Sequence, residues 1–525
     1  MNRLRLVGWQ RRVLAIFLTL LTLRITAYFF AILNDGFLHA GLNYDESYFA
    51  WCGWMIDKGY APYRDFLEFK PPMTFITHAL ALKLFGFQHF EYRKFFAYFP
   101  LGSLLAVQLA MLSRRIDRWL ALALTLAFIQ IWVNPSFHDV ALSDSESIGL
   151  TYYLFAIAFL LARTRLGPAL QWIGGAFFAC CILSKEPFLP CVGMSWISLF
   201  LIGDEPGTLG VRARRYAGRT IGGGLVVLGI LCLYMIPSGA LRAYLDVLHR
   251  YFHFYRDVKE SYCVVLGRFH PTKPFNDLHM QWRAARQAFA NSTLLGFLAP
   301  FGVASTIFIF KRSRVLFVSV LIGLASALWA VTASNCQWAH YYTMTMSGLF
   351  FALVVGLDSM TPHFRAMSRA SRAFVSAALL AGVLMHVWVR FDAERDKYGT
   401  RVGQDFDSQE PIPGVFEAVK QYTSPSDYIV TTGAPSLYMQ VDRINGMRES
   451  TTDDEVLGFY SGDTDKQKLS VVRAELLRTR PKLIILDSNP SGDGRKRRWR
   501  AALWDPFISE LHYREVKPRI YLRPD

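Results

Sequence analysis

The stretch Ile221–Ile236, "IGGGLVVLGILCLYMI", decides the class of fold, because no residue in it is charged. Comparable apolar runs occur at 13–23, 101–112 and 294–310. Each approaches the roughly 20 apolar residues with which a helix crosses a bilayer. Of the 525 residues, 52% are hydrophobic and 19% are charged, and the charged share is below the roughly 25% of a soluble globular domain. The sequence therefore predicts a polytopic helical membrane protein.

The net charge of +16 is distributed unevenly along the chain. Lys and Arg cluster at the ends of alternate apolar runs, whereas the connections around 134–143 and 333–339 contain neither residue. This alternation is the bias that keeps positive loops in the cytoplasm. It accounts for much of the excess charge and argues against a nucleic-acid partner. The basic clusters include Arg114 and Arg115, Arg214 and Arg215, Lys311 and Arg312, and Arg365 and Arg369.

Together these patterns predict about eleven membrane spans, with the N-terminus in the cytoplasm and the C-terminus outside. The first run follows basic residues but contains Arg24 and lacks a small-x-small cleavage site, so we predict an uncleaved span. The predicted spans are 13–33, 93–113, 118–133, 144–162, 167–183, 187–202, 218–236, 292–310, 315–332, 340–357 and 373–391.

Three long segments are predicted outside the cytoplasm, at 34–92, 237–291 and 392–525. The first contains an apolar stretch at 73–86 that is too short to span, and the second begins with apolar residues at helical spacing. Both patterns are typical of helices that lie in the membrane interface. In the third segment, predicted strands and helices alternate, which indicates a small α/β domain beyond a membrane domain at 1–391.

The seven cysteines form no metal-binding spacing and no disulfide framework. Those in the predicted spans are Cys180, Cys181, Cys191 and Cys232. The other three, Cys52, Cys263 and Cys336, are predicted outside the cytoplasm, and a disulfide between two of them stays open.

An adjacent acidic pair, Asp45 and Glu46, follows the first predicted span by about ten residues. The simplest interpretation is structural: a helix that starts near Glu46 would place Asp45 at its N-cap, where carboxylates are favoured. A functional interpretation is compatible with it, because the start of a helix holds a carboxylate in a fixed direction.

A second motif in the same segment is "EFKPP", Glu68–Pro72. The backbone of Lys70 is pushed toward an extended form by Pro71, and the two prolines suit the first turn of the following helix. A lysine held at this place near lipid headgroups is well placed to meet a phosphate. The alternative is a lysine that only anchors the interface.

Further candidates lie where predicted spans begin on the same side of the membrane. Glu146 opens the fourth span, where Ser143 or Asp144 would cap the helix. Lys185 stands between the fifth and sixth spans, either to bind an anion or to pair with Glu186. His340 and Tyr341 begin the tenth span, and aromatic residues are common at that depth.

With these residues, the chain resembles the GT-C superfamily of glycosyltransferases over about 1–390. The branch most similar to it contains protein O-mannosyltransferases, lipid A aminoarabinose transferases and rhizobial galacturonosyltransferases. The resemblance is carried by "YDESYFA", "GYAPYRDFLEFKPPMTF", Glu146, "GGAFFACCILSKEP" and "HYY". Two departures are visible: Phe69 separates Glu68 from Lys70, and "HYYTMTMSG" lacks a proline common after this step.

The resemblance implies inverting transfer of a sugar from a polyprenyl-phosphate carrier to a glycan, lipid or protein acceptor. The reaction would occur on the outer face of a bacterial inner membrane, in the assembly or modification of envelope glycans or lipopolysaccharide. Asp45 would remove the proton of the acceptor hydroxyl. The leaving phosphate would be stabilised by Lys70, Lys185 and His340, and other substrate contacts would come from Glu46, Tyr48, Glu68, Glu146 and Tyr341. No cofactor is certain, and a divalent cation held by Asp45, Glu46 and Glu146 stays open.

Two other classes of protein compete with this interpretation. A transporter or flippase of lipid-linked sugars would share the many spans, but its charged residues would lie near the midplane and repeats would be common. Here the acids lie at the outer rim and no internal repeat is visible. A non-catalytic scaffold of the same fold is disfavoured by the intact Asp-Glu and Lys-Pro-Pro elements.

Overall fold

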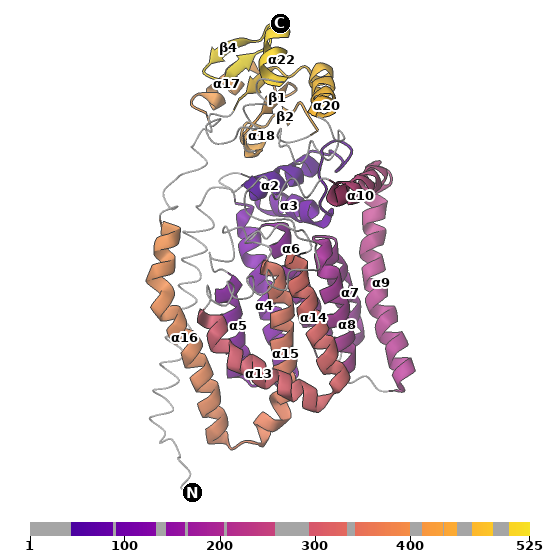
Figure 1. The fold of residues 1–525 in the computed structure, drawn as a ribbon, viewed down its shortest axis with the longest axis vertical. Coiled ribbons are helices and arrows are strands. Elements are labelled where there is room, and N and C mark those ends of the chain that lie inside the picture. The colour runs from indigo at the N-terminus through magenta and orange to yellow at the C-terminus, as the bar shows by residue number, and fades with distance from the viewer. Residues whose placement is uncertain are drawn as a thin grey trace. The chain divides into compact units, whose positions relative to one another are not determined.

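A computed structural model gives the arrangement of the chain (Figure 1). The predicted span 13–33 lies outside the described residues, as do His340 and Tyr341. The described residues are 44–87, 91–132, 143–162, 166–203, 207–257, 293–332, 342–399, 412–433, 435–448, 465–486 and 503–524.

The described residues divide into two compact units that do not follow chain order. The helical unit comprises the helices from 94 to 230 and from 293 to 399. The mixed unit joins residues up to Arg93, the helix that follows Leu231, and the C-terminal segment. It thus brings together three segments that are far apart in the sequence.

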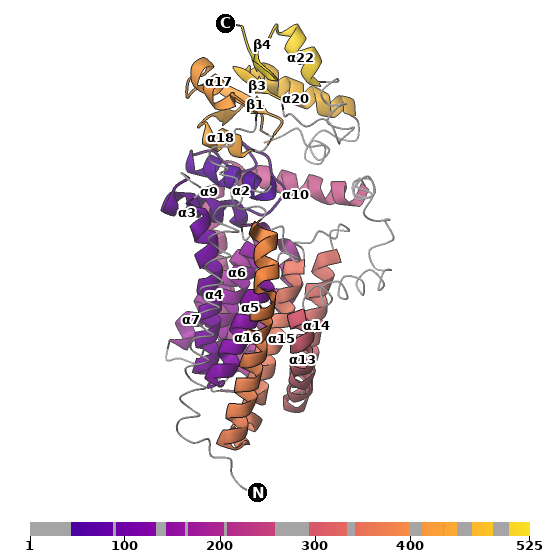
Figure 2. The same ribbon diagram turned by 90° about the vertical axis from the view of Figure 1, so that its left-hand side faces the viewer.

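In the helical unit, a helix occupies each predicted span from 93 onward. These helices run roughly parallel to one another in both views (Figures 1 and 2). Their bounds are α4 Arg93–Ser113, α5 Arg118–Trp132, α6 Ser145–Leu161, α7 Gly167–Ile182, α8 Leu189–Ile202, α9 Leu209–Met235, α13 Thr293–Arg312, α14 Arg314–Thr332, α15 Tyr342–Ala366 and α16 Arg369–Gly399. A 3₁₀ turn, η3 Glu186–Phe188, precedes α8.

Within the described part of the chain, α4, α9 and α15 are long and apolar enough to cross a membrane. Shorter apolar helices, among them α5, α6, α7, α8 and α14, accompany them. The chain is therefore a helical membrane protein, as predicted, and the number of eleven spans stays a prediction.

Glycines allow α7 and α9 to pack with their backbones in contact. A Cβ atom at Gly175 would lie 1.9 Å from the carbonyl oxygen of Thr220, and one at Gly223 would lie 1.9 Å from that of Trp172. Small residues bring helices this close in membrane proteins, where van der Waals packing drives association.

This contact yields a prediction for a matched pair of substitutions on α9. Gly223→Ala should lower the thermal stability of the purified protein, because the new methyl group overlaps a backbone carbonyl of α7. Gly229→Ala meets no atom within 4 Å, so it should leave stability unchanged or raise it by up to about 1 kcal/mol through helix propensity. Equal melting temperatures for the two variants, measured in detergent, would contradict this packing.

Buried hydroxyl groups also join helices of the helical unit. The hydroxyls of Tyr153 on α6 and Ser195 on α8 lie 2.6 Å apart, and those of Ser198 and Ser319 link α8 to α14 at 2.7 Å. Hydrogen bonds of this kind satisfy polar groups that have no water nearby.

The mixed unit contains α2 Tyr44–Asp57, α3 Met73–Phe85 and α10 Ala240–Asp257, followed by the C-terminal elements. Helices are confirmed at both places where the sequence predicts interfacial helices. The C-terminal elements are α17 Val415–Tyr422, β1 Tyr428–Thr431, α18 Ser436–Gln440, β2 Ile444–Asn445, α20 Asp465–Thr479, β3 Leu483–Ile485, α22 Asp505–Glu510, β4 Arg514–Lys517 and β5 Ile520–Leu522.

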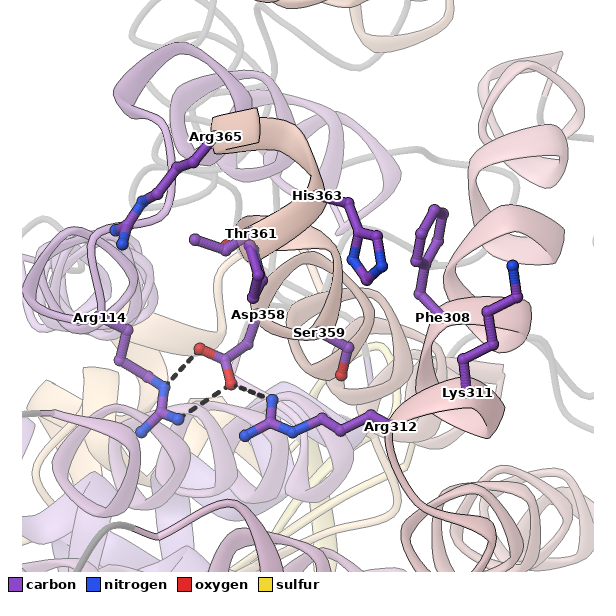
Figure 3. A pocket seen from close by; sticks show the side chains of 10 residues that line it. Arg114, Phe308, Lys311, Arg312, Asp358, Ser359, Thr361, His363 and Arg365 are labelled. Carbon is purple, nitrogen blue, oxygen red and sulfur yellow. Dashed lines mark hydrogen bonds and ion pairs between the residues drawn. The ribbon is translucent and has the colours of Figure 1, made fainter. Parts of the chain in front are cut away.

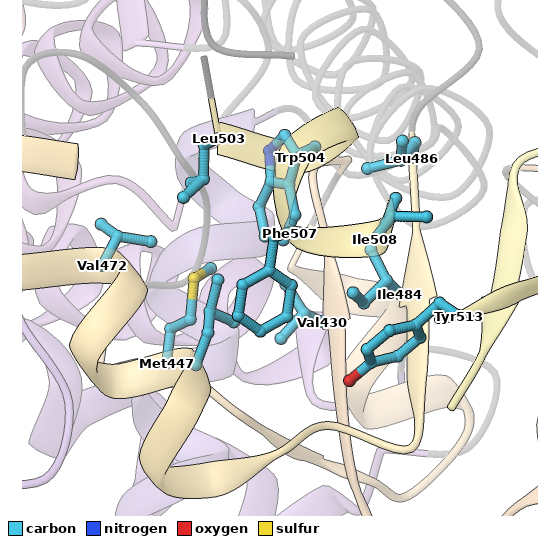
Figure 4. Close-up of a cluster of buried hydrophobic side chains, with 11 residues drawn as sticks. Val430, Met447, Val472, Ile484, Leu486, Leu503, Trp504, Phe507, Ile508 and Tyr513 are labelled. Atoms are coloured by element: carbon cyan, nitrogen blue, oxygen red, sulfur yellow. The ribbon is translucent and has the colours of Figure 1, made fainter. Parts of the chain in front are cut away.

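The C-terminal strands form one sheet in the order β2-β1-β3-β5-β4. The first three strands are parallel, and β5 runs antiparallel to both β3 and β4. One face packs on a cluster in which Phe507 and Trp504 of the α22 region lie against Val430 and Ile484 of the sheet (Figure 4). The predicted alternation of strands and helices is confirmed, whereas α18, β2 and β4 are missed because they are short.

The last helix of the C-terminal segment, α22, begins at Asp505 with Pro506 in the first turn. Proline is tolerated there because the first turn has no internal hydrogen bond to lose.

Within the mixed unit, the C-terminal segment contacts α2 directly. The amide of Ser436 donates to the hydroxyl of Ser47 at 2.8 Å, and the rings of Trp51 and Tyr438 lie 6.1 Å apart. Arg448 donates to the carbonyl of Tyr63 at 2.7 Å. Helix α18 of the C-terminal segment therefore packs on the helix that carries the acidic pair.

Candidate functional site

Helix α2 carries the acidic pair at its start. The helix begins at Tyr44, so Asp45 lies inside the first turn and not at the N-cap, which corrects the expected capping role. A carboxylate in the first turn is favoured by the unpaired amide groups of the helix start. The side chain of Asp45 lies outside what the structure describes.

Glu46 forms a buried ion pair with Arg93, the first residue of α4. Nε of Arg93 donates to Oε1 of Glu46 at 2.9 Å, and Nη2 donates to Oε2 at 3.0 Å. The two side chains are 2% and 1% exposed. Parallel donation of this kind is the strongest geometry for such a pair. It holds the start of α2 in a fixed direction.

The loop between α2 and α3 is held against α2 by polar contacts. The Tyr48 hydroxyl donates to the carbonyl of Leu67 at 2.6 Å, and the Tyr63 hydroxyl donates to that of Lys70 at 2.7 Å. Oε1 of Glu68 accepts from the amides of Phe69 and Lys70 at 2.9 and 3.0 Å. Tyr48 and Glu68 thus fix the backbone that presents Lys70.

The ammonium group of Lys70 lies on α2. Its Nζ stands 4.3 Å from the ring centroid of Phe49 and 5.4 Å from that of Phe69, which are cation–π distances. The pKa of the Cys52 thiol, one turn further along α2, is raised by burial; Glu68 raises it further and Lys70 opposes the shift. Both charged side chains therefore act on the middle of α2. Cys52 itself is a buried free thiol.

Asp65 closes a turn within the same loop. Its carboxylate accepts from the amide of Ala61 at 2.8 Å and from Nε and Nη2 of Arg64 at 2.7 and 2.6 Å. Burial raises the pKa of Asp65, but the hydrogen bond from Arg64 and the amide of Ala61 outweigh it and hold the pKa below its usual value.

A lowered pKa in the folded protein means that the ionised carboxylate stabilises the fold. This contribution is complete above the unfolded pKa, near 3.8, and is lost as the pH falls through the lower folded value. We therefore expect Asp65→Asn to weaken the loss of thermal stability that acidification causes below about pH 4. Melting curves of both proteins from about pH 6 to 3 check this, and parallel curves would contradict it.

In the helical unit, the start of α6 places Glu146 beside Lys185. Asp144 caps α6 by accepting from the amide of Ser147 at 2.7 Å, as predicted. Nζ of Lys185 lies 2.6 Å from Oε1 of Glu146, and the Ser145 hydroxyl donates to Oε2 at 2.8 Å. The pair is 10% and 2% exposed.

The structure pairs Lys185 with Glu146. The sequence interpretation left anion binding and a pair with Glu186 open and did not consider Glu146. The contact forms because the end of α7 lies against the start of α6, which brings residues 39 positions apart together.

Two of the three residues considered for a divalent cation, Glu46 and Glu146, are engaged with side-chain cations. Glu46 binds Arg93 and Glu146 binds Lys185. Among the described residues, no group of three His, Cys, Asp or Glu side chains could hold a metal ion. The participation of a cation stays open.

The sequence analysis missed Asp358. It lies in α15 between Arg114 and Arg312, which the sequence assigns only to the cytoplasmic charge bias. A single acid within the last turns of an otherwise apolar span was the available signal, because such residues are costly in a membrane and usually paired.

Comparison with known proteins gives structural matches but no sequence matches. No protein-family model matches the chain, and no curated protein sequence matches it. ArnT from Cupriavidus metallidurans, solved with undecaprenyl phosphate bound, superposes with a TM-score of 0.58 at 13% identity, over 97% of both chains.

An archaeal oligosaccharyltransferase, AglB from Archaeoglobus fulgidus in complex with an inhibitory peptide and a dolichol phosphate, gives a TM-score of 0.44 at 13% identity. This match covers 91% of the present chain and 69% of AglB. ArnT and AglB are GT-C superfamily members. The GT-C fold that the sequence predicts is therefore confirmed, by the full-length likeness to ArnT, at the level of the fold.

Proposed function

We propose that this protein is an inverting glycosyltransferase that takes a sugar from a polyprenyl-phosphate carrier. The acceptor is a hydroxyl group of a glycan, lipid or protein on the non-cytoplasmic face of the membrane. The observation that carries the proposal is the position of Lys70 against the helix that holds Asp45, in a chain with the GT-C fold. The structural neighbour ArnT, which was solved with undecaprenyl phosphate, supports a carrier of the same chemistry.

The periodicity of α2 connects Lys70 with position 45. Phe49, on which the Lys70 ammonium lies, is four residues after Asp45. Positions i and i+4 are neighbours on one face of a helix. The ammonium of Lys70 thus lies one helical turn from the position of Asp45. Tyr48 joins the loop to the helix, and Glu68 fixes the backbone of the loop.

This arrangement suits the chemistry of transfer from a sugar phosphate. In the proposed reaction, Asp45 accepts the proton of the attacking hydroxyl, which typically contributes about 10²–10⁴-fold. The bond between the anomeric carbon and the phosphate oxygen breaks, and the phosphate leaves as an anion. Lys70 stabilises the charge that develops on it.

We assign positioning roles to the residues that the structure shows engaged. Glu46 acts through Arg93 to set the direction of the first turn of α2, and Tyr48 and Glu68 set the path of the Lys70 loop. Glu146 holds the ammonium of Lys185, which we propose as a second phosphate contact. His340 and Tyr341 remain proposed substrate contacts from the resemblance alone.

The packing of the mixed unit supports the placement of all its segments on one side of the membrane. Residues 40–93, the helix α10 and the C-terminal segment form one compact unit, so they lie on one side of the membrane. With the charge bias, we propose that this side is the periplasmic side of a bacterial inner membrane and that 392–525 acts there as a separate domain.

The test uses the purified full-length protein with a polyprenyl-phosphate sugar in liposomes. A transferase releases polyprenyl phosphate in the presence of an acceptor, whereas a transporter moves the carrier and leaves the sugar-phosphate bond intact. Mass spectrometry of a deletion strain should then show an accumulated carrier-sugar and one envelope product that lacks the sugar. An intact bond with every acceptor class, together with carrier movement, would replace this proposal by the transporter.

A further inference from the structure

A cluster of charges lies in the helical unit and includes none of the residues proposed for transfer (Figure 3). Arg114 donates to Asp358 through Nε and Nη2, at 2.7 and 2.9 Å. Arg312 donates to the same carboxylate through Nη1 at 2.7 Å. The side chains of Arg114 and Asp358 are buried, at 3% and 6% exposed. One carboxylate serves two guanidinium groups, so positive charge is in excess.

A cavity of about 410 Å³ opens beside this cluster. Lys311 and Arg365 add two more positive charges to its lining, and Asp358 is its single acid. Ser359, which is 4% exposed, also lines the cavity, and its buried hydroxyl has no hydrogen-bond partner among the described residues. A buried hydroxyl without a partner is unfavourable, unless a bound group supplies one.

We propose that this cavity binds a phosphate group, that of an anionic lipid headgroup. Guanidinium groups match phosphate oxygens with planar pairs of donors, and the Ser359 hydroxyl supplies one more donor. The cavity is within the range of small-molecule sites and larger than a bare phosphate requires, which favours a headgroup.

The position of the cavity supports a lipid headgroup as its ligand. It lies where α4 and α13 end and in the last turns of α15, at the basic clusters that the charge bias assigns to the cytoplasmic leaflet. Basic pockets between membrane helices on that side bind anionic lipid headgroups. Charge bias alone explains the basic residues, but it explains neither the cavity nor the Ser359 hydroxyl. The proposal does not depend on the glycosyltransferase assignment.

The experiment compares variants of the full-length protein in neutral detergent. Lys311→Gln/Arg365→Gln removes two charges from the lining and leaves the Arg114–Asp358–Arg312 cluster intact. Arg214→Gln/Arg215→Gln removes two charges from exposed residues of α9 outside the cavity and is the matched control. Ser359→Ala removes the hydroxyl without changing charge. Retention of phosphatidylglycerol and phosphatidylcholine is measured by native mass spectrometry, and inorganic phosphate is tested by its effect on the melting temperature.

Phosphatidylglycerol should bind wild type and the Arg214/Arg215 control alike. Its affinity should fall roughly 20-fold for the Lys311/Arg365 variant, since each basic residue near a membrane surface contributes about fivefold, and should also fall for Ser359→Ala. Inorganic phosphate alone could instead raise the melting temperature of wild type and of the control, and do so less for the cavity variants. That result would support a phosphate site whose ligand is soluble. Equal affinities in the cavity variants and the control, for lipid and phosphate both, would overturn the proposal.

Discussion

Replacement of Asp45 by Asn is expected to slow sugar transfer by roughly 10²–10⁴-fold, the usual contribution of a positioned general base. Asparagine keeps the size of the side chain but cannot accept the proton of the acceptor hydroxyl. Position 45 is in the first turn of α2, where loss of the carboxylate costs about 0.3–1 kcal/mol, so the melting temperature should change little. Initial rates with saturating carrier-sugar, measured alongside melting curves, check both statements.

The matched control is Asp57→Asn, the same substitution in the last turn of the same helix, at an exposed residue. It should leave the rate within about twofold of wild type, since surface substitutions rarely change the free energy of unfolding by more than about 0.5 kcal/mol. Transfer by Asp45→Asn at a rate equal to that of Asp57→Asn would remove the proposed base and leave the fold assignment untouched.

The largest expected effect on stability is that of Arg93→Met. This change leaves the Glu46 carboxylate buried without its cation, and removing one member of a buried ion pair typically costs about 3–5 kcal/mol. We expect a marked drop in the melting temperature of the detergent-purified protein. Because the pair fixes the start of α2, transfer should fall as well.

Two variants separate loss of the pair from loss of packing. Glu46→Leu/Arg93→Met removes both charges and should recover most of the lost stability, since apolar replacements of buried pairs are often neutral. Lys58→Met breaks a pair with Asp442 that is 40% and 62% exposed, and it should cost at most about 1 kcal/mol. If the double variant is no more stable than Arg93→Met, the charge of Glu46 is not the cause.

The membrane architecture could be predicted because each span is encoded locally. A run such as Ile221–Ile236 is apolar whatever its neighbours are. Helix α4 coincides with its predicted span, and α9 ends within one residue of its predicted end, although it begins nine residues earlier, at Leu209. The basic clusters and the Asp45-Glu46 and Lys70-Pro71 elements are equally local, so the GT-C fold and the candidate residues followed from the sequence.

The partners of the charged residues could not be predicted, because each contact joins distant parts of the chain. Glu46 meets Arg93 after 47 residues and Arg114 meets Asp358 after 244. In the low dielectric of a membrane protein, a buried charge must find an opposite charge, but many basic residues satisfy that rule equally. Only helix packing selects among them, as it selects Glu146 as a partner of Lys185.

By itself, the sequence determined the helical membrane class, the positions of the apolar helices and the candidate residues for catalysis and binding. The tertiary structure decided which charged residues pair with one another and that α18 of the C-terminal segment packs on α2. The physical reason is that each apolar run and each basic cluster interacts with the membrane independently of the rest of the chain. An ion pair or a packing contact forms only when two distant segments come together.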